Sequence, residues 1–264
     1  MTGPRPLALV TGASSGIGQA YAERLASDGW DLIVCGRRAD RLQDLATRLQ
    51  AQSSAMTEVI VGDLGEDAGL ERVAAACRER ELEMLVNNAG LAHYMPFTEL
   101  SPEEAEELVR VNVLAPTLLA RAALIGMVAR GRGTIINLAS LLAFSEAVHR
   151  PGMPQRAVYA GTRSYIVTFT RILAAELAGT GVRVQVVCPG IVRTEFHARQ
   201  GIDMADVPTM EPADIVRGSL AGLERGEVVC APSLEDPSAF DRHDQANAEL
   251  LQGARNTELA DRYR

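Results

Sequence analysis

One stretch of sequence, LALVTGASSGIG at residues 7–18, decides the fold class of this chain. Its first four residues, Leu7 to Val10, are apolar and predict a short buried strand. The glycines follow without a break, and apolar residues spaced by three or four over 20–26 predict an amphipathic helix after them. A strand, a glycine-rich turn and a helix in direct succession are the context in which such a turn binds a dinucleotide.

The three glycines of this stretch have separate roles in a dinucleotide site. Gly12 permits a tight turn, Gly16 lets the backbone approach the pyrophosphate, and Gly18 lets the helix pack against the strand. The N-terminus of the helix supplies free amide groups for the phosphates. We therefore expect dinucleotide binding here, and the alternative is an ordinary turn between a strand and a helix.

Strands and helices alternate along the rest of the chain. Apolar runs predict seven strands, at residues 6–11, 32–36, 58–62, 84–87, 134–138, 183–188 and 227–230. Periodic apolar residues predict helices that include 20–26, 42–49, 70–77 and 166–177. We expect an α/β chain with a single Rossmann domain over residues 1–264, a doubly wound parallel sheet with helices on both faces. The polar residues 235–264 are expected to form a C-terminal helix or tail.

The composition excludes several classes of protein. The 264 residues are 47% hydrophobic and 23% charged, as in ordinary globular proteins. No window approaches the roughly 18 uninterrupted apolar residues of a membrane span. The net charge of −8 repels nucleic acid and anionic membranes. We therefore expect a cytoplasmic protein with no nucleic-acid or membrane partner, in which a bound phosphate needs a local basic pocket.

Cysteine and lysine usage are both informative. The four cysteines lie far apart, with no CxxC pair and no nearby His, so we expect buried free thiols and no metal site. All 26 basic residues are Arg, and the sequence contains no Lys. An Arg at a functional position is therefore consistent with a bias of the whole chain.

The end of the second predicted strand indicates which dinucleotide is bound. A carboxylate there accepts hydrogen bonds from a free ribose 2′-hydroxyl, but this sequence has Gly36-Arg37-Arg38. Arg37 or Arg38 can pair with a 2′-phosphate through a planar, permanently charged group, which favours NADP(H). The alternative is that both arginines are solvated at a helix start. Asp63, after the third strand, is placed to accept from the adenine amino group or to cap a helix.

Further motifs follow in a definite order. They are Asn87-Asn88-Ala89-Gly90 after the fourth strand, Asn112 in a long helical segment, Ser140 after the fifth strand, Tyr159 at the next helix, and Pro189-Gly190 with Thr194 in a PGxxxT pattern. With the glycine stretch, this set resembles the short-chain dehydrogenase/reductase (SDR) family over about residues 7–194. The resemblance implies an oxidoreductase that transfers a hydride between NADP(H) and a carbonyl or secondary alcohol.

The resemblance also assigns catalytic roles. Tyr159 is the general acid that protonates the substrate oxygen, and Ser140 hydrogen-bonds the same oxygen. The family has a Lys four residues after the Tyr, on the same helical face, whose charge favours the phenolate and which holds the nicotinamide ribose. This chain has Arg163 instead, which keeps the charge but is bulkier and does not release a proton. The electrostatic role therefore survives more easily than a proton relay.

Asn112 is expected in the same site for a backbone reason. Pro116 has no amide hydrogen, so the Asn112 carbonyl loses its helical partner and can hold a water. In the family the equivalent Asn anchors a relay water beside the basic residue. The alternative is a proline kink with an incidental Asn. Taken singly, Ser140 could also cap a strand end and Tyr159 could be a half-buried core residue.

The remaining expectations concern the contacts of cofactor and substrate. The expected cofactor-binding residues are Gly12, Ser14, Ser15, Gly16, Ile17, Gly18, Arg37, Arg38, Asp63, Leu64, Asn88, Ala89, Gly90, Tyr159, Arg163, Pro189, Gly190, Val192 and Thr194. Substrate contacts are expected in an apolar pocket formed by an inserted loop at 145–156, by residues 91–97, and by Phe196, His197, Met204 and Met210.

Two rival functions remain beside an active reductase. One is a non-catalytic NADPH-binding sensor or scaffold, in which Arg163 marks the lost catalytic Lys. The other is a structural subunit of a larger reductase complex. The family resemblance further implies a homodimer or homotetramer formed through the helices of Asn112 and Tyr159, where the small Ala160 and Gly161 permit close packing.

Overall fold

The computed structural model describes residues 5–146, 148 and 155–264. The chain divides into two compact units, Met1–Pro232 and Ser233–Arg264. The second unit contains α9 (Ser238–Gln252) and two short 3-10 turns, Gly253–Arg255 and Asp261–Tyr263. The assignment of all 264 residues to one domain with a C-terminal appendage therefore stays a prediction.

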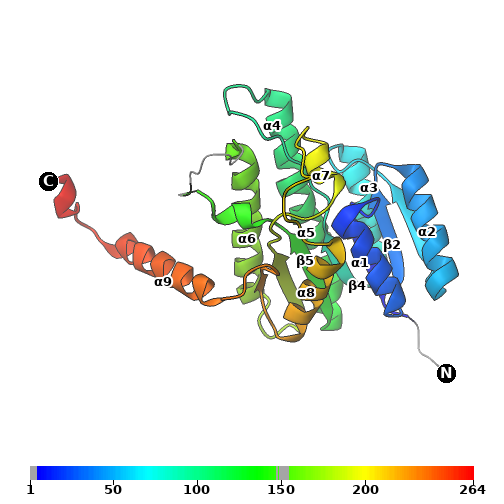
Figure 1. Ribbon diagram of the computed structural model, residues 1–264. Coiled ribbons are helices and arrows are strands. Elements are labelled where there is room, and N and C mark those ends of the chain that lie inside the picture. Colours follow the sequence, from blue (N-terminus) through cyan, green and yellow to red (C-terminus); the bar gives the residue numbers. More distant parts are fainter. Residues whose placement is uncertain (1–4, 147, 149–154) are drawn as a thin grey trace. The chain divides into compact units, whose positions relative to one another are not determined.

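The first unit is built on one parallel sheet (Figure 1). Its strands are β1 (Leu7–Thr11), β2 (Asp31–Gly36), β3 (Thr57–Val61), β4 (Leu82–Asn87), β5 (Gly133–Leu138), β6 (Val182–Val187) and β7 (Val229–Cys230). Their order across the sheet is β3-β2-β1-β4-β5-β6-β7. All paired strands run in the same direction. The predicted doubly wound α/β fold is confirmed, with the chain reversing its direction of travel across the sheet between β1 and β4.

Helices connect the strands as the alternating pattern predicts. They are α1 (Gly16–Ser27), α2 (Ala39–Ser53), α3 (Asp67–Glu79), α4 (Pro102–Val109), α5 (Ala115–Arg130), α6 (Ala157–Glu176), α7 (Glu195–Ala198) and α8 (Pro212–Glu224). A five-residue π-helical turn, η1 (Arg110–Leu114), joins α4 to α5, and a 3-10 turn, η2 (Leu141–Phe144), follows β5. Each predicted strand and helix is therefore present, with ends that differ by a few residues.

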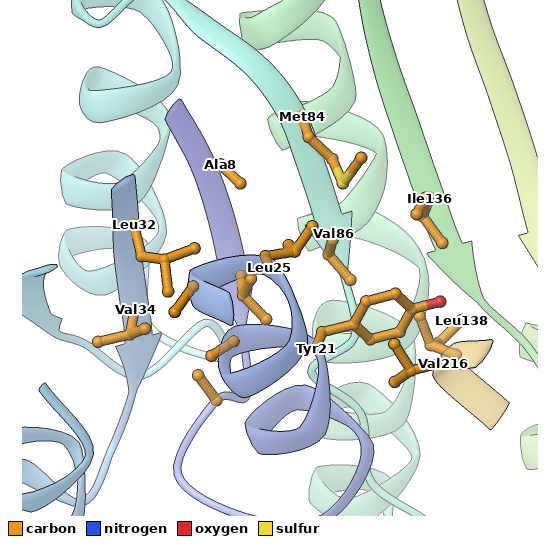
Figure 2. Packing of buried hydrophobic residues seen from close by; sticks show 14 of the residues in the cluster. Ala8, Tyr21, Leu25, Leu32, Val34, Met84, Val86, Ile136, Leu138 and Val216 are labelled. Atoms are coloured by element: carbon orange, nitrogen blue, oxygen red, sulfur yellow. The ribbon is translucent and has the colours of Figure 1, made fainter. Parts of the chain in front are cut away.

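Two hydrophobic layers hold the helices on the sheet because alternate strand residues point to opposite faces. Ala8 and Val10 of β1 face a layer that includes α1, α2 and α8, whereas Leu9 faces a layer that includes α3, α5 and α6. Figure 2 shows the first layer, with Tyr21 and Leu25 of α1 packed over the strands. The two layers bury the sheet on both sides and leave the carboxyl ends of its strands for a site.

The helical segment Pro102–Arg130 is apolar as well as long. An 18-residue window within it has a mean hydropathy of 1.7, so it could cross a membrane by length and composition alone. Half of that window is buried inside the protein. Leu119, Ala123 and Met127 of α5 lie in the layer against the sheet. One side of the segment therefore packs in the core, which accounts for the apolar residues on that side.

The cysteines match their prediction as buried free thiols. Burial raises the pKa of the Cys35, Cys77 and Cys188 thiols to about 12 and that of Cys230 to about 11. The neutral thiol is the unreactive form, so these four side chains act as small apolar groups in the core.

Candidate functional site

One cavity of about 1080 Å³ lies at the carboxyl ends of the strands. It runs from the glycine turn after β1 to the residues that follow β4, β5 and β6. This is the point at which doubly wound sheets bind ligands, because the chain reverses direction there and leaves a crevice. All predicted catalytic and cofactor-binding residues are in the described part of the chain, and all except Gly18 and Asn112 line this cavity.

The glycine turn has the geometry that its sequence predicts. Gly12 and Gly16 have φ of +67° and +58°, a backbone conformation that L side chains rarely adopt. A Cβ atom on Gly16 would lie 3.0 Å from a Thr194 methyl carbon, so the turn and the segment after β6 face each other across little space. A Cβ on Gly18 would lie 2.4 Å from the Asn88 amide nitrogen, and Gly18 therefore serves packing.

The segment after β4 is tied to the same turn. The Asn88 side-chain amide donates to the Thr11 carbonyl at 2.9 Å, and the backbone amides of Asn88 and Ala89 donate to the Thr11 hydroxyl at 3.0 Å each. Asn87 points into the sheet instead, where its amide donates to the Asn137 side chain at 2.9 Å. Residues 87–89 therefore fix the relative position of β1, β4 and β5 at the cavity.

Arg37 and Arg38 point in different directions, which the sequence left open. Arg38 Nη2 donates to the Ser14 and Ser15 hydroxyls at 2.9 and 2.7 Å, directly on the glycine turn. Arg37 Nη1 lies 3.4 Å from the Asp63 carboxylate. Asp63 also accepts from the Gly65 amide at 2.8 Å, while α3 begins four residues after it. Asp63 thus closes a turn and is not the cap of α3.

Tyr159 and Arg163 lie one turn apart on α6 and face the same cavity. The Arg163 guanidinium carbon is 5.0 Å from the centre of the Tyr159 ring. Arg163 is only 5% exposed, and its Nη1 donates to the Leu138 carbonyl at 3.1 Å. A Cβ on Gly90 would lie 2.3 Å from Arg163 Nη2, so the guanidinium packs directly on the Gly90 backbone. Within the described residues, the buried Nε of Arg163 has no hydrogen-bond partner.

Asn112 lies behind Arg163 in the π-helical turn η1. Its Oδ1 accepts from Arg163 Nη2 at 3.3 Å and from the Leu91 amide at 3.1 Å. Its Nδ2 donates to the Leu91 carbonyl at 3.0 Å and to the Thr162 hydroxyl at 3.2 Å. The helix is irregular before Pro116, as the missing amide hydrogen predicts. The side chain of Asn112 holds Arg163 in place, and the water on its carbonyl stays a prediction.

Ser140 and the apolar side chains form the other end of the cavity. Ser140 Oγ accepts from the Leu142 amide at 3.1 Å at the start of η2. Leu141, Leu142, Phe196, Met204 and Val207 are among the apolar lining residues. Met210 was expected with them, but it forms a bridge with Val192 and packs against the core. The inserted loop at 145–156 lies largely outside the described residues, at 147 and 149–154.

Two cavity residues have contacts that the sequence did not indicate. Tyr94 packs edge-on against Tyr159 with 5.2 Å between ring centres, and burial raises its pKa, so its phenol stays protonated. Glu195 forms ion pairs with Arg38, Arg41 and Arg199. Their hydrogen bonds lower the pKa of Glu195 to about 2. Only its place directly after Thr194 of the PGxxxT pattern marks Glu195 in the sequence.

Solved structures resemble the whole chain. A short-chain dehydrogenase from Sphingobium yanoikuyae, in complex with NADPH, superposes with a TM-score of 0.92 at 36% identity, covering 98% of this chain and 100% of that one. The bulky-bulky ketone specific alcohol dehydrogenase from Comamonas testosteroni superposes with a TM-score of 0.88 at 32% identity, covering 98% of each chain.

Sequence relatives include a protein named as inactive. The human inactive hydroxysteroid dehydrogenase-like protein 1 is 34% identical over 195 residues, which are 72% of this chain and 57% of the human protein. The chain thus spans little more than half of that relative. Residues 6–204 match the family described as short chain dehydrogenase. With the sheet order, the glycine turn and the Tyr159–Arg163 pair, this match shows that the chain belongs to the short-chain dehydrogenase/reductase family.

Proposed function

We propose that this protein is an NADP(H)-dependent oxidoreductase that interconverts a carbonyl and a secondary alcohol. The observation that carries the proposal is a single cavity that contains the glycine turn at one end and the Tyr159–Arg163 pair at the other. A ligand pocket usually has a volume of about 300–1000 Å³, so about 1080 Å³ leaves room for a dinucleotide and a substrate together.

The described residues fit the dinucleotide at three points. The Gly12–Gly16 turn lines the cavity, and α1 begins there with free amide groups. Arg38 and Ser14 offer donors at the position for a 2′-phosphate. Arg163 lines the cavity beside Tyr159, where its positive charge suits a ribose hydroxyl. NADP(H) is favoured over NAD(H) because the residue at the end of β2 is Gly36, which has no carboxylate to accept from a ribose 2′-hydroxyl.

Tyr159, Arg163 and Ser140 control proton transfer to the substrate oxygen. When bound, the nicotinamide supplies or accepts the hydride. Tyr159 donates its phenolic proton to the substrate oxygen, and the Arg163 charge 5.0 Å from its ring stabilises the phenolate that remains. Ser140 already accepts from Leu142, so its own hydrogen is available to the same oxygen. Asn112 acts through Arg163, whose position it fixes.

The substrate is an apolar ketone or the corresponding alcohol. Leu141, Leu142, Phe196 and Val207 surround the Tyr159 end, and a similar chain from Comamonas testosteroni carries the name of a bulky-bulky ketone specific enzyme. Burial lowers the pKa of His197, which keeps that imidazole neutral near pH 7. A neutral, apolar surface of this kind favours an uncharged substrate with large groups on both sides of the carbonyl.

A carbonyl screen that follows NADPH absorbance tests this function. We expect turnover of at least one bulky ketone, and Tyr159→Phe should lower it by about 1000-fold because the proton donor is lost. The matched control is Tyr263→Phe, an exposed phenol in the C-terminal unit. Binding of NADPH to Tyr159→Phe should stay within about twofold of the parent. An unchanged rate in Tyr159→Phe would refute the assigned proton donor.

The second candidate is a non-catalytic NADP(H)-binding protein. It is favoured by Arg163 at the position of the family's Lys and by the human relative that is named as inactive. This candidate predicts tight NADPH binding without turnover across the whole screen. If Arg163→Lys then created turnover that the parent lacks, the sensor would be the better description.

The apolar outer surface of α5 and α6 supports a homo-oligomer. Its exposed members are Leu118, Ile125 and Val128 of α5 and Tyr165 and Ile172 of α6, with Leu114 at the end of η1 directly before α5. The hydroxyl oxygens of Thr117 and Tyr165 are 3.1 Å apart, so a hydrogen bond joins the two helices. Open space lies beside Gly161. Several large apolar side chains exposed on two joined helices are typical of an interface. Light scattering should show a dimer or tetramer, which Ile125→Glu with Ile172→Glu dissociates and the exposed control Met56→Glu does not.

A further inference from the structure

Glu195 brings three guanidinium groups together at the entrance to the cavity. Its carboxylate is 2.9 Å from Arg38 Nη1, 2.6 Å from Arg41 Nη1 and 2.6 Å from Arg199 Nη2. Arg38 and Arg41 flank the start of α2, whereas Glu195 begins α7, more than 150 residues later. The contact therefore connects the segment after β2 with the segment that lines the substrate end.

Two of these arginines, Arg38 and Arg199, also contact the glycine turn. Arg38 Nη2 donates to Ser14 and Ser15, and Arg199 Nη2 lies 3.4 Å from the Ser15 hydroxyl. Three cations and one carboxylate leave this cluster positively charged, in a chain whose net charge is −8. It is therefore a local basic pocket of the kind that a phosphate requires in an acidic protein.

A carboxylate and a phosphate are interchangeable partners for guanidinium groups. Both present oxygen acceptors that match the planar donor fork of Arg. Glu195 is nearly half exposed, so its ion pairs are weakened by water and can be exchanged at small cost. A phosphate that carries close to two negative charges is the stronger competitor for the same donors.

We propose that Arg41 and Arg199 join Arg38 as partners of the cofactor 2′-phosphate, and that Glu195 is an internal counter-ion that this phosphate replaces. The inference rests on the proposed use of NADP(H), and adds two binding residues and a competitor to it. Glu195 weakens NADP(H) binding through competition, and a cofactor without the 2′-phosphate leaves Glu195 on its arginines.

The exchange has a consequence at the substrate end because Glu195 is the first residue of α7. Phe196 is the next residue, and the centres of its ring and of the Tyr159 ring are 6.2 Å apart. His197 lines the same cavity. Release of Glu195 separates the start of α7 from Arg38 and Arg41, while Arg199 at the end of α7 contacts the phosphate instead. Binding of the phosphorylated cofactor therefore changes the position of α7, whereas the unphosphorylated cofactor does not.

Calorimetry with two nucleotides tests the proposal without catalysis. Adenosine 2′,5′-bisphosphate and adenosine 5′-monophosphate differ only in the 2′-phosphate, and neither contains nicotinamide. Glu195→Gln should tighten binding of the bisphosphate by about fivefold, because the competitor and its repulsion are removed. Arg41→Ala and Arg199→Ala should each weaken it by about fivefold to tenfold. Binding of the monophosphate should change by less than about twofold in all three variants, which also verifies their folding.

Arg48→Ala is the matched control, because Arg48 lies on the same helix as Arg41 and pairs with Glu23 instead. It should leave both nucleotides unaffected. The proposal is overturned if Glu195→Gln fails to raise the preference for the bisphosphate, or if Arg41→Ala and Arg199→Ala act no differently from Arg48→Ala. A parent protein without any preference for the bisphosphate would contradict the NADP(H) assignment as well, so the two failures are distinguishable.

Hydrogen exchange of the parent protein provides a second readout. The bisphosphate should change the exchange of peptides that cover α7 relative to the monophosphate, since Glu195 has been displaced. Glu195→Gln should remove that difference. Equal exchange of α7 with both nucleotides in the parent protein would show that the carboxylate stays in place.

Discussion

The two ends of the cavity each contain an arginine, in opposite environments. The Arg38 side chain is 29% exposed and pairs with a carboxylate. Arg163 is 5% exposed and donates to two neutral oxygens, the Leu138 carbonyl and the Asn112 side-chain amide. An exposed ion pair is weak and exchangeable, whereas a buried cation is costly to place and costly to disturb. Arg38 therefore suits reversible binding of an anion, and Arg163 suits a fixed charge beside the reacting groups.

Among the variants that compare the two arginines, the largest effect is expected at the buried end of the cavity. Arg163→Met keeps the length of the side chain but removes the charge 5.0 Å from the Tyr159 ring, and turnover should fall by about 100-fold or more. Steady-state kinetics with the best ketone of the screen measure this, and a thermal melt verifies folding. Turnover equal to that of the parent would mean that the phenol works without a neighbouring charge.

The next effect is specific to the exposed end. Arg38→Ala should weaken NADPH binding by about tenfold and leave NADH binding nearly unchanged, because only the 2′-phosphate needs this cation. Arg37→Ala is the paired comparison: Arg37 is directed to Asp63, so its loss should change the NADPH dissociation constant by only about twofold. Larger losses in Arg37→Ala than in Arg38→Ala would reverse the assignment of the two side chains.

A smaller effect is expected when the buried cation is exchanged for the residue that the family has. Arg163→Lys keeps the charge and can hold the ribose, so turnover should change by about fivefold or less. Part of the change should appear in KM, because Lys cannot make both bonds of Arg163 to Leu138 and Asn112. A rise of several hundredfold would show that the guanidinium is a poor substitute.

The smallest effect concerns pH and the Glu195 ion pairs. Their hydrogen bonds lower the pKa of Glu195 from its ordinary 4.5 to about 2. A carboxyl with a depressed folded-state pKa stabilises the fold above its unfolded pKa, and this stabilisation is lost as the pH falls from about 4.5 through 2. The contribution should be below about 1 kcal/mol because the group is nearly half exposed. In urea unfolding, Glu195→Gln should therefore differ from the parent at pH 6 and match it near pH 2.

The sequence was sufficient where the fold depends on neighbouring residues. The strand, glycine turn and helix over residues 7–27 follow from residues that are adjacent in the chain. The succession of the remaining strands and helices along the chain follows in the same way. The predicted position of Tyr159 and Arg163 on one helical face followed from their spacing of four. Their 5.0 Å separation confirms that position.

The sequence was insufficient where contacts join distant segments. The different directions of Arg37 and Arg38 depend on Asp63, in the connection after β3, and on Glu195, in the connection after β6. Glu195 lies 157 residues from Arg38, and no local pattern predicts that pairing. Asn112 was predicted from its backbone carbonyl, but the structure adds its side-chain bonds to Leu91 and Arg163, which depend on how η1 packs.

The close approach of Gly90 to Arg163 limits which sequences can carry an arginine at this position. Even the single methyl group of alanine at residue 90 would overlap the guanidinium in its present position, where it donates to the Leu138 carbonyl. The missing side chain at 90 thus acts as reserved volume for a larger cationic head. A descendant of this protein that acquired alanine there would have to move the guanidinium away from Asn112, which holds it in the site.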